Sequence, residues 1–399
     1  MKKLIVLCVA TAWLAAAAPP EVSKITPRLQ SFVDRGAISG AVALASHKGE
    51  IAYFDAVGFQ DLETRKPMRK DSIFQIMSMT KPIVAVAAAI LMEEGKLALS
   101  DPVEKHLPEF RGLWMIESRG AGGRTRTLKR PSRTITIRDL MTHTSGMIGG
   151  MPPEGAKELY QTMNLTLAQA VFLFSQQPLD FEPGTKWQYS NPGIATLGRI
   201  VEVVADQPFE KFLEDRIFRP LAMKDSFFFP PPDKIDRIAM VYRLENGKLK
   251  RAGSDILGGD PALYRKGAKY PAPEFGLYST AADLRAIYEM MLNGGTYNGK
   301  RILSKAAVEL MTQLHTGAIE PAGHSPGMGY GLAWTVVRDE IGTLQLQSKG
   351  TFGHGGAFGT QGWIDPKKSV VGVFLIQRSG GDPAESKSFM NMVGAALSE

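Results

Sequence analysis

The sequence predicts an α+β fold: one antiparallel sheet, built from both ends of the chain and flanked by helices, with an inserted, mainly helical lobe. Strand-like segments at 41–46 and 51–58 lie near the N-terminus. Strand character returns at 331–337, 357–365 and 370–377, whereas helical patterns fill the middle of the chain. Because strands must bury their apolar faces against a common core, the two sets are expected to join in one sheet.

The chain begins with a helical pattern that a β-hairpin follows. Within 21–35, apolar residues recur at the spacing of one helix face. These residues are Val22, Ile25, Leu29, Phe32 and Val33. The strands at 41–46 and 51–58 come next, and residues 47–50 are expected to form the turn between them.

Three helices are predicted in the middle of the chain, over 79–94, 192–205 and 281–292. Asn191 is the expected N-cap of the second helix, with Pro192 at its first position, where a missing N–H costs little. Thr280 and Asp283 resemble a capping box at the start of the third helix. A last helix over 384–397 is expected to close the chain.

The first residues are typical of an export signal, because Lys2 and Lys3 precede an apolar stretch that small residues follow. We expect cleavage near Ala17 or Ala18, and therefore a periplasmic or secreted protein. The expected organisation is a signal peptide over 1–18 and one domain over 19–399, with a sheet lobe at about 19–70 and 295–399 and a helical lobe at about 71–294.

The composition is that of a globular protein and excludes cysteine chemistry. Hydrophobic residues make up 44% of the 399 residues and charged residues 22%, which are ordinary fractions. The single cysteine, Cys8, lies in the expected signal without small residues just before it, so we expect neither lipidation nor a stable membrane anchor. Cleavage would remove two lysines, lowering the formal charge from +7 to +5, and would leave no thiol. The histidines show no metal-ligand spacing, so we expect no metal and no cofactor.

Much of the positive charge lies between residues 111 and 138. Arginine and lysine alternate there with glycine, and no aromatic residue follows Trp114 within the stretch. A nucleic-acid site is expected to combine basic side chains with aromatic ones. We therefore interpret the stretch as a solvated surface loop and expect no nucleic-acid partner.

Ser78 and Lys81 form an S-x-x-K pattern where the first long helix begins. Residues three apart lie on one helix face, so the Lys81 ammonium is expected beside the Ser78 hydroxyl. A serine needs a neighbouring base or cation to become a good nucleophile, and a helix N-terminus adds partial positive charge. Taken alone, the pattern fits a serine N-cap beside an exposed lysine better.

Tyr189 and Asn191 stand at the mouth of the second helix, after a Pro-Gly turn. In that place they would present a phenol and a carboxamide to one cleft. A helix cap with a packed tyrosine is the alternative.

A third motif, His354-Gly355-Gly356-Ala357, leads into a predicted strand. Its two glycines would let a substrate backbone lie close to that strand. The N–H groups of Ser78 and Ala357 would then form an oxyanion hole. A glycine-rich turn with a surface histidine is the alternative.

Together and in this order, the three motifs resemble those of the serine β-lactamase and penicillin-binding protein superfamily. The likeness is closest to class C β-lactamases and family VIII carboxylesterases, and it runs from about Leu29 to the C-terminus. It includes the stretches 140–146, 276–280 and 329–332. The resemblance implies a β-lactamase/transpeptidase-like fold.

The resemblance also implies roles for individual residues. Ser78 would be acylated, and Lys81 and Tyr189 would share proton transfer without a fixed division of the base role. The substrate-binding residues would be Asn191, His354, Gly355 and Gly356. His143, in the first of the three matching stretches, is interpreted as structural.

A second serine also matches a hydrolase pattern. Ser325 is the centre of a G-x-S-x-G sequence, and a triad of Ser325, Asp339 and His354 can be written down. That pattern requires a strand before the serine and a helix after it. Because Pro321 precedes it and Pro326 interrupts it, we interpret the segment as a loop.

One departure from the family pattern bears on function. Penicillin-processing relatives usually carry Lys-Thr-Gly where this chain has His354-Gly355-Gly356, and histidine is mostly uncharged near neutral pH. We therefore expect poor binding of anionic penicillins and favour an esterase acting on small esters through acyl-Ser78. A D-alanyl peptidase or weak β-lactamase is the alternative among enzymes, and a non-catalytic ligand-binding or sensor module the alternative of another class. The expected partner is a small-molecule ester or amide, and the oligomeric state is left open.

Overall fold

A computed structural model of the chain describes residues 20–120, 125–149, 162–253, 267–381 and 383–398. The expected signal peptide and its cleavage site lie outside these residues. None of the helices in these ranges combines the length and the apolar character that a bilayer span requires.

The centre of the fold is an eight-stranded sheet in which every neighbouring pair is antiparallel, in the order β12-β13-β14-β15-β16-β1-β2-β3. Its strands are β1 (Gly40–His47), β2 (Glu50–Asp61), β3 (Lys66–Pro67), β12 (Met328–Tyr330), β13 (Thr335–Val337), β14 (Phe352–Gly355), β15 (Gln361–Asp365) and β16 (Val370–Leu375). The two ends of the chain meet where β1 pairs with β16. The predicted fold class is therefore confirmed.

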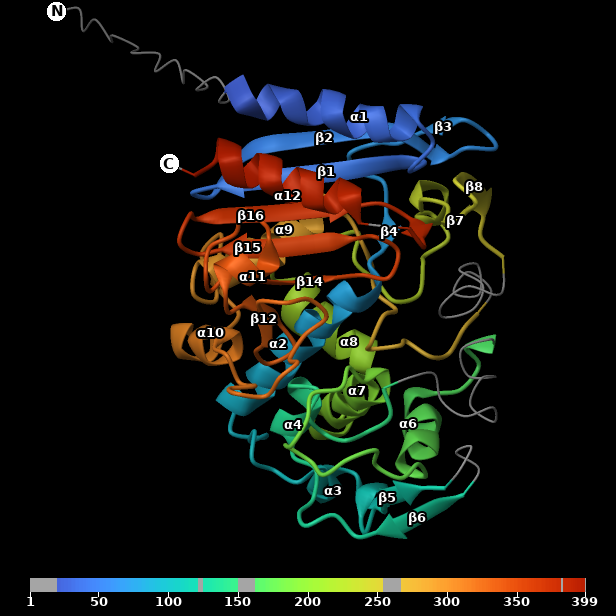
Figure 1. The fold of residues 1–399 in the computed structure, drawn as a ribbon, viewed down its shortest axis with the longest axis vertical. Helices are drawn as coiled ribbons and strands as arrows, with labels where there is room; N and C mark the ends of the chain where they lie inside the picture. The colour runs from blue at the N-terminus through green and yellow to red at the C-terminus, as the bar shows by residue number, and fades with distance from the viewer. Residues whose placement is uncertain (1–19, 121–124, 150–161, 254–266, 382, 399) are drawn as a thin grey trace, which may run out of the picture.

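Helices cover both faces of this sheet (Figure 1). On one face lie α1 (Ile25–Asp34), which the short η1 (Pro20–Lys24) precedes, and α12 (Ala384–Ala396). Their apolar sides pack on the sheet in one core cluster, which includes Phe32, Trp363 and Phe389. The other face carries α9 (Ala281–Leu292), beyond which the helical part of the chain extends.

The helical part is organised around α2. Its helices are α2 (Thr80–Glu93), α3 (Val103–His106), α4 (Ile137–Met141), α6 (Leu167–Ser175), α7 (Asn191–Ala205), α8 (Phe209–Leu213) and the one-turn elements η2 (Met77–Met79), η3 (Pro108–Phe110), η5 (Glu214–Phe218) and η6 (Ile235–Arg237). Every residue of α2 from Thr80 to Leu91 is buried. A helix buried on all sides must be apolar all round, which explains its run of alanine, valine and isoleucine.

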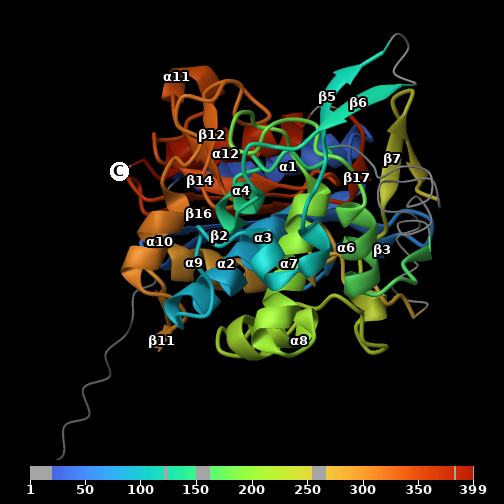
Figure 2. The same cartoon turned by 90° about the horizontal axis from the view of Figure 1, so that it is seen from below.

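Smaller elements complete the fold. They are α10 (Lys305–Thr312), α11 (Glu340–Thr343), the pairs β4–β9 (Phe74–Gln75, Tyr278–Ser279), β5–β6 (Met115–Arg119, Arg126–Lys129) and β10–β11 (Thr296–Tyr297, Lys300–Arg301), and the three-stranded β17-β7-β8 (Arg378–Ser379, Tyr242–Glu245, Lys248–Arg251). The basic stretch predicted as a loop instead contains the β5–β6 hairpin, which projects from the body (Figure 2). All four side chains of β6 are exposed.

Three sequence-based boundaries are wrong. Residues 331–337 are not one strand, because the chain reverses between β12 and β13, with Gly331 N–H bonded to Trp334 O at 2.8 Å. The strand predicted over 357–365 begins only at Gln361, after a turn that Gly356 N–H closes on Thr360 O. The N-cap of α7 is Ser190, whose hydroxyl accepts from Gly193 N–H, so Asn191 is the first helical residue.

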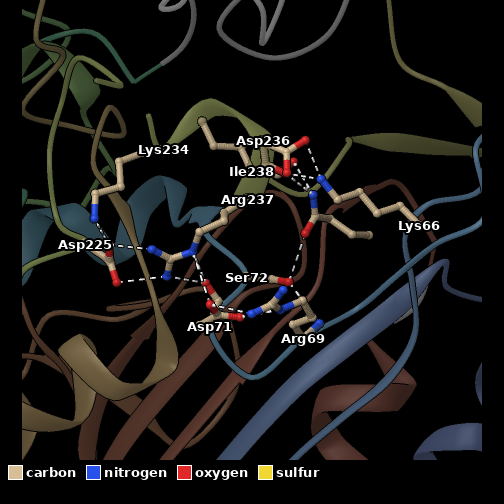
Figure 3. Close-up of polar contacts among 10 residues, drawn as sticks. Lys66, Arg69, Asp71, Ser72, Asp225, Lys234, Asp236, Arg237 and Ile238 are labelled. Atoms are coloured by element: carbon tan, nitrogen blue, oxygen red, sulfur yellow. Dashed lines mark hydrogen bonds and ion pairs between the residues drawn. The ribbon is translucent and has the colours of Figure 1, made fainter. Parts of the chain in front are cut away.

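A charged network fixes the segment that leads to β4 (Figure 3). The Arg237 guanidinium donates to both carboxylate oxygens of Asp225 at 2.8 and 2.9 Å, and to the backbone oxygen of Asp71. Lys234 pairs with the same Asp225 at 2.8 Å. Because Asp71 lies shortly before Ser78 in the chain, this network helps to position the start of α2. We call Asp71, Asp225, Lys234 and Arg237 the Arg237 cluster.

Candidate active site

Ser78 lies in η2, the single turn that opens into α2. Met77, just before it, has φ of 52°, a left-handed conformation that side chains other than glycine rarely adopt. Bonds on both sides hold this turn, since Thr360 Oγ1 donates to Ile76 O at 2.9 Å and Thr80 Oγ1 donates to Met77 O at 2.6 Å. The surrounding structure therefore sustains a backbone geometry that raises Ser78 out of the regular helix.

Lys81 is fully buried, and its amine reaches the serine. The Lys81 Nζ donates to Ser78 Oγ at 3.0 Å and to the backbone oxygen of Glu274 at 2.6 Å. Burial disfavours the charged amine and lowers the pKa of Lys81 to about 7, although the nearby Glu274 charge opposes the shift. A substantial fraction of this lysine is therefore neutral near pH 7.

Tyr189 lies on the other side of the same serine. Its hydroxyl is hydrogen-bonded to Ser78, and its ring lies 4.6 Å from Lys81 Nζ. Burial raises the pKa of Tyr189 above its ordinary value, and the bond to Ser78 offsets only part of that rise. Two proton-carrying groups with displaced pKa values thus converge on one serine hydroxyl, as acid–base catalysis requires.

Asn191 is the first residue of α7, and its role in substrate binding stays a prediction. It is not among the residues that line the cavity beside Ser78. Its side-chain oxygen is buried and has no hydrogen-bond partner within the described residues.

His143 packs against Tyr189. Its ring lies 4.5 Å from the Tyr189 ring, and its Nδ1 accepts from Ser190 N–H at 3.1 Å. Burial, reinforced by the positive charge of Lys81, holds the pKa of His143 well below its usual range. These contacts make His143 a positioning residue for Tyr189.

His354 lies in β14 with both ring nitrogens bonded to protein. Nδ1 is 2.7 Å from Gly355 O, a carbonyl that can only accept, so Nδ1 carries the proton. Nε2 therefore accepts from the Tyr330 hydroxyl at 2.8 Å. Burial, and then the charge of Lys81, lower the pKa of His354 to about 3. The histidine is neutral and 3% exposed, so it is not the surface histidine of the alternative interpretation.

Packing explains Gly356, the second glycine after His354. A Cβ on Gly356 would stand 2.4 Å from Ile76 O and 2.1 Å from Thr360 Oγ1, so only glycine fits where the end of β14 meets η2. A Cβ on Gly355 would meet only the end of a flexible side chain, Gln361 Oε1 at 2.7 Å, which can move aside. The exposed Ala357 follows directly and lines the same cavity as Ser78.

A cavity of about 490 Å³ opens beside Ser78. Its wall includes Tyr189, His354 and Ala357, and also residues of α12, among them Met390. Ser325 also lines it, from bends and a turn that precede β12 rather than from a strand-to-helix turn. The competing triad is not assembled, because Asp339 caps α11 and the His354 nitrogens have other partners.

Sequence reasoning missed two of the side chains around this site. Tyr330 has no predicted role beyond its place in the matching stretch 329–332, although its hydroxyl donates to His354 Nε2. His324, in the competing serine motif, packs its ring 4.7 Å from that of Tyr189. Neither has a periodic or spacing pattern that predicts its place. Within the described residues, no group of three or more histidine, cysteine or acidic side chains could hold a metal ion.

The fold and the convergence on Ser78 define a serine hydrolase, and the enzyme class predicted from the sequence is confirmed. The chain belongs to the Beta-lactamase family, which it matches over residues 25–396. The predicted family resemblance is thereby confirmed.

Individual relatives include both esterases and a peptidase-like protein. Esterase EstB of Burkholderia gladioli is 31% identical over 371 residues, which cover 86% of this chain and 88% of that protein. A protein of Escherichia coli (strain K12), provisionally named a D-alanyl-D-alanine carboxypeptidase, is 28% identical over 80% of this chain and 72% of its own length. Among solved structures, EstCE1, a hydrolase with promiscuous acyltransferase activity, matches with a TM-score of 0.80 and 26% identity, covering 95% of this chain and 99% of that one.

Proposed function

We propose that this serine hydrolase is a carboxylesterase acting on small esters through an acyl-Ser78 intermediate. The observation that carries the proposal is the position of Ser78 Oγ between a lysine with a pKa of about 7 and a protonated tyrosine, beside a neutral His354. The relatives EstB and EstCE1, a named esterase and a named hydrolase, support the same class.

The proposed acylation begins with proton transfer from Ser78 to neutral Lys81. The Ser78 oxygen then forms a bond to the ester carbonyl carbon, and the N–H groups of Ser78 and Ala357 donate hydrogen bonds to the carbonyl oxygen, on which the negative charge develops. As the carbon–alkoxy bond breaks, the leaving oxygen receives a proton through Tyr189 or Lys81. Attack by water on the acyl-serine, with the same groups moving the proton, releases the carboxylic acid and restores the Ser78 hydroxyl.

Lys81 suits the base role better than Tyr189. The lowered pKa of Lys81 makes the proton-accepting amine abundant near neutral pH, whereas the raised pKa of Tyr189 keeps its hydroxyl protonated. Tyr189 then acts as a proton relay toward the leaving group. This division of labour is part of the proposal.

The absence of charge at His354 favours esters over anionic β-lactams. Both nitrogens of His354 are bonded within the protein and the ring stays neutral, so it supplies no cation for a substrate carboxylate. Peptidase activity on D-alanyl substrates is the second candidate, and the named Escherichia coli relative favours it. Hydrolysis of an amide would require the same attack by Ser78. Its leaving nitrogen would need a more complete proton transfer than the leaving oxygen of an ester.

The test compares substrate classes on one enzyme preparation. We expect wild-type protein to hydrolyse p-nitrophenyl butyrate with a kcat/KM orders of magnitude above that for nitrocefin, and to be labelled by a fluorophosphonate probe. A preference for nitrocefin or for a D-alanyl-D-alanine peptide would contradict the esterase assignment. Failure of both labelling and turnover would favour the binding-module alternative.

We also propose that the enzyme is exported and that its first 18 residues are removed. The N-terminal pattern of two lysines, an apolar stretch and small residues supports this. N-terminal sequencing of the protein recovered from a periplasmic fraction should begin near residue 18 or 19. Recovery of an uncleaved protein from the cytoplasm would contradict export.

A further inference from the structure

Two polar side chains in the cavity wall are left without protein partners. Thr351, just before β14, is 1% exposed, yet its hydroxyl has no hydrogen-bond partner among the described residues. The side-chain oxygen of Gln345 is also buried and unpartnered in the same part of the chain. Both residues line the cavity that contains Ser78. Because buried polar groups are nearly always bonded, two unpaired ones in the wall of one cavity call for an explanation.

The segment that carries Gln345 is turned with its polar side inward. Thr343, Gln345 and Gln347 line the cavity, whereas Leu344 and Leu346 are 82% and 52% exposed. Core packing would favour the opposite orientation, with leucine inside and glutamine outside. The polar lining of this wall is therefore not a product of hydrophobic burial, and it points to a ligand.

We propose, building on the esterase function above, that Thr351 and Gln345 form a second subsite for an uncharged hydrogen-bonding group of the substrate. The Gln345 oxygen accepts from a hydroxyl or amide N–H, and the Thr351 hydroxyl donates to or accepts from the same group. Neither subsite residue is charged. The lining residues include no carboxylate, and their one lysine, Lys387 on α12, is exposed. The substrate class is thus an ester whose remote arm carries a hydroxyl or an amide.

The distance along β14 sets the length of that arm. Thr351 is four residues from Gly355, at the Ser78 end of the strand, and an extended strand rises about 3.3 Å per residue, or roughly 13 Å in all. An acetyl or butyryl ester is too short to span this distance. Short esters are therefore expected to react without sensing the subsite.

The test uses two series of long-arm esters, p-nitrophenyl alkanoates and alkyl butyrates, each ending in methyl, hydroxyl or carboxylate. In the series whose long arm reaches the subsite, we expect the wild-type kcat/KM for the ester with a terminal hydroxyl to exceed that for the ester with a terminal methyl about tenfold. This is the scale of one uncharged hydrogen bond. Thr351→Val should abolish this preference and leave p-nitrophenyl acetate hydrolysis within about twofold.

The matched control is Thr335→Val. Thr335 lines the same cavity, but its hydroxyl already donates to Gly353 O at 2.6 Å, so the preference should survive its loss. Gln345→Met is the second subsite variant and should lower the preference even if Thr351→Val does not fold. Three results would overturn the subsite. They are an equal kcat/KM for methyl-ended and hydroxyl-ended esters in both series, a preference for carboxylate-ended esters, and an unchanged hydroxyl preference in folded subsite variants. Lack of p-nitrophenyl acetate hydrolysis by the wild-type enzyme would instead overturn the esterase function.

Discussion

Two polar clusters flank β4 and have opposite electrostatics. In the Arg237 cluster, which holds the segment before β4 through Asp71, Arg237 and Lys234 are both paired with the Asp225 carboxylate (Figure 3). In the Ser78 site, which follows β4, Lys81 forms no ion pair with any described residue and bonds only to a hydroxyl and a backbone carbonyl. Both clusters place cations beside polar partners, Arg237 and Lys234 partly buried and Lys81 fully buried, but only the first cluster neutralises its cations.

The pKa values follow this difference. Burial alone would raise the pKa of Asp225, yet the bonds from Arg237 and Lys234 outweigh it and hold that pKa below its usual range. The bond to Asp225 raises the pKa of Arg237. The pKa of Lys81, which is buried without a paired carboxylate, is instead lowered to about 7. Paired charges hold the chain in place, whereas an unpaired buried amine is ready to exchange a proton.

The largest expected effect separates the two serines in the cavity. Ser78→Ala should reduce ester turnover by at least about 1,000-fold and remove fluorophosphonate labelling, the scale seen when a nucleophile is lost. Ser325→Ala is the matched control and should stay within a few-fold of wild type, because Ser325 lies in bends and a turn before β12 and the His354 nitrogens of the competing triad are bonded elsewhere. A folded, inactive Ser325→Ala enzyme with an active Ser78→Ala enzyme would assign the chemistry to the other serine.

The next effect tests whether Lys81 and Tyr189 act as one unit. Lys81→Ala and Tyr189→Phe should each lower kcat by at least about 100-fold, the scale of positioned acid–base catalysis. The double variant should lose less than the product of the two, since both serve one proton path. Full activity in a folded Tyr189→Phe enzyme would remove the tyrosine from the mechanism.

The pH profile tests the unpaired state of Lys81 directly. Since the neutral amine is the base, kcat/KM should fall about tenfold per pH unit below about 7 and level off above it. The measurement is the hydrolysis of p-nitrophenyl butyrate between pH 5 and 9 at constant ionic strength. A profile that still rises about tenfold per pH unit at pH 9, without levelling off, would show a lysine with an ordinary pKa.

Breaking the paired cluster should change stability rather than chemistry. Arg237→Met leaves the Asp225 and Asp71 carboxylates without their shared cation, and should lower the free energy of unfolding by about 2–3 kcal/mol, less than for a fully buried pair. Arg69→Met is the control, because Arg69 is 68% exposed and should cost under about 1 kcal/mol. Chemical denaturation measures both, and kcat for p-nitrophenyl butyrate should stay within a few-fold.

The smallest effect concerns Asp283, which borders the Arg237 cluster. Burial raises the pKa of Asp283 to about 6, although bonds from Ser226 and the Asp225 N–H oppose the rise. A folded-state pKa above the unfolded value means that the stabilising contribution is full below about pH 4 and is lost as the pH rises through 6. Asp283→Asn should therefore stabilise the protein by about 1–2 kcal/mol at pH 8 and have little effect at pH 4. Equal effects at both pH values would show that Asp283 has an ordinary pKa.

Much of the fold was predictable because it depends on local patterns. The positions of α2, α9 and α12 and the pairing of both termini in one sheet follow from periodicity. The failures lie at turns, such as 331–334, where Gly331 packs against the backbone of Met311 from another element. No local pattern predicts such a contact.

The sequence by itself determined the contact between Ser78 and Lys81, because residues three apart at the start of a helix lie on the same face. It also determined that position 354 carries histidine rather than lysine. Only the tertiary structure decided that Lys81 has a pKa of about 7 and that the neutral His354 accepts from Tyr330. It also decided that Thr351 lines the cavity with its buried hydroxyl unpaired among the described residues. These properties arise from burial by segments distant in the chain, and burial depends on how those segments pack rather than on the residues nearby in sequence.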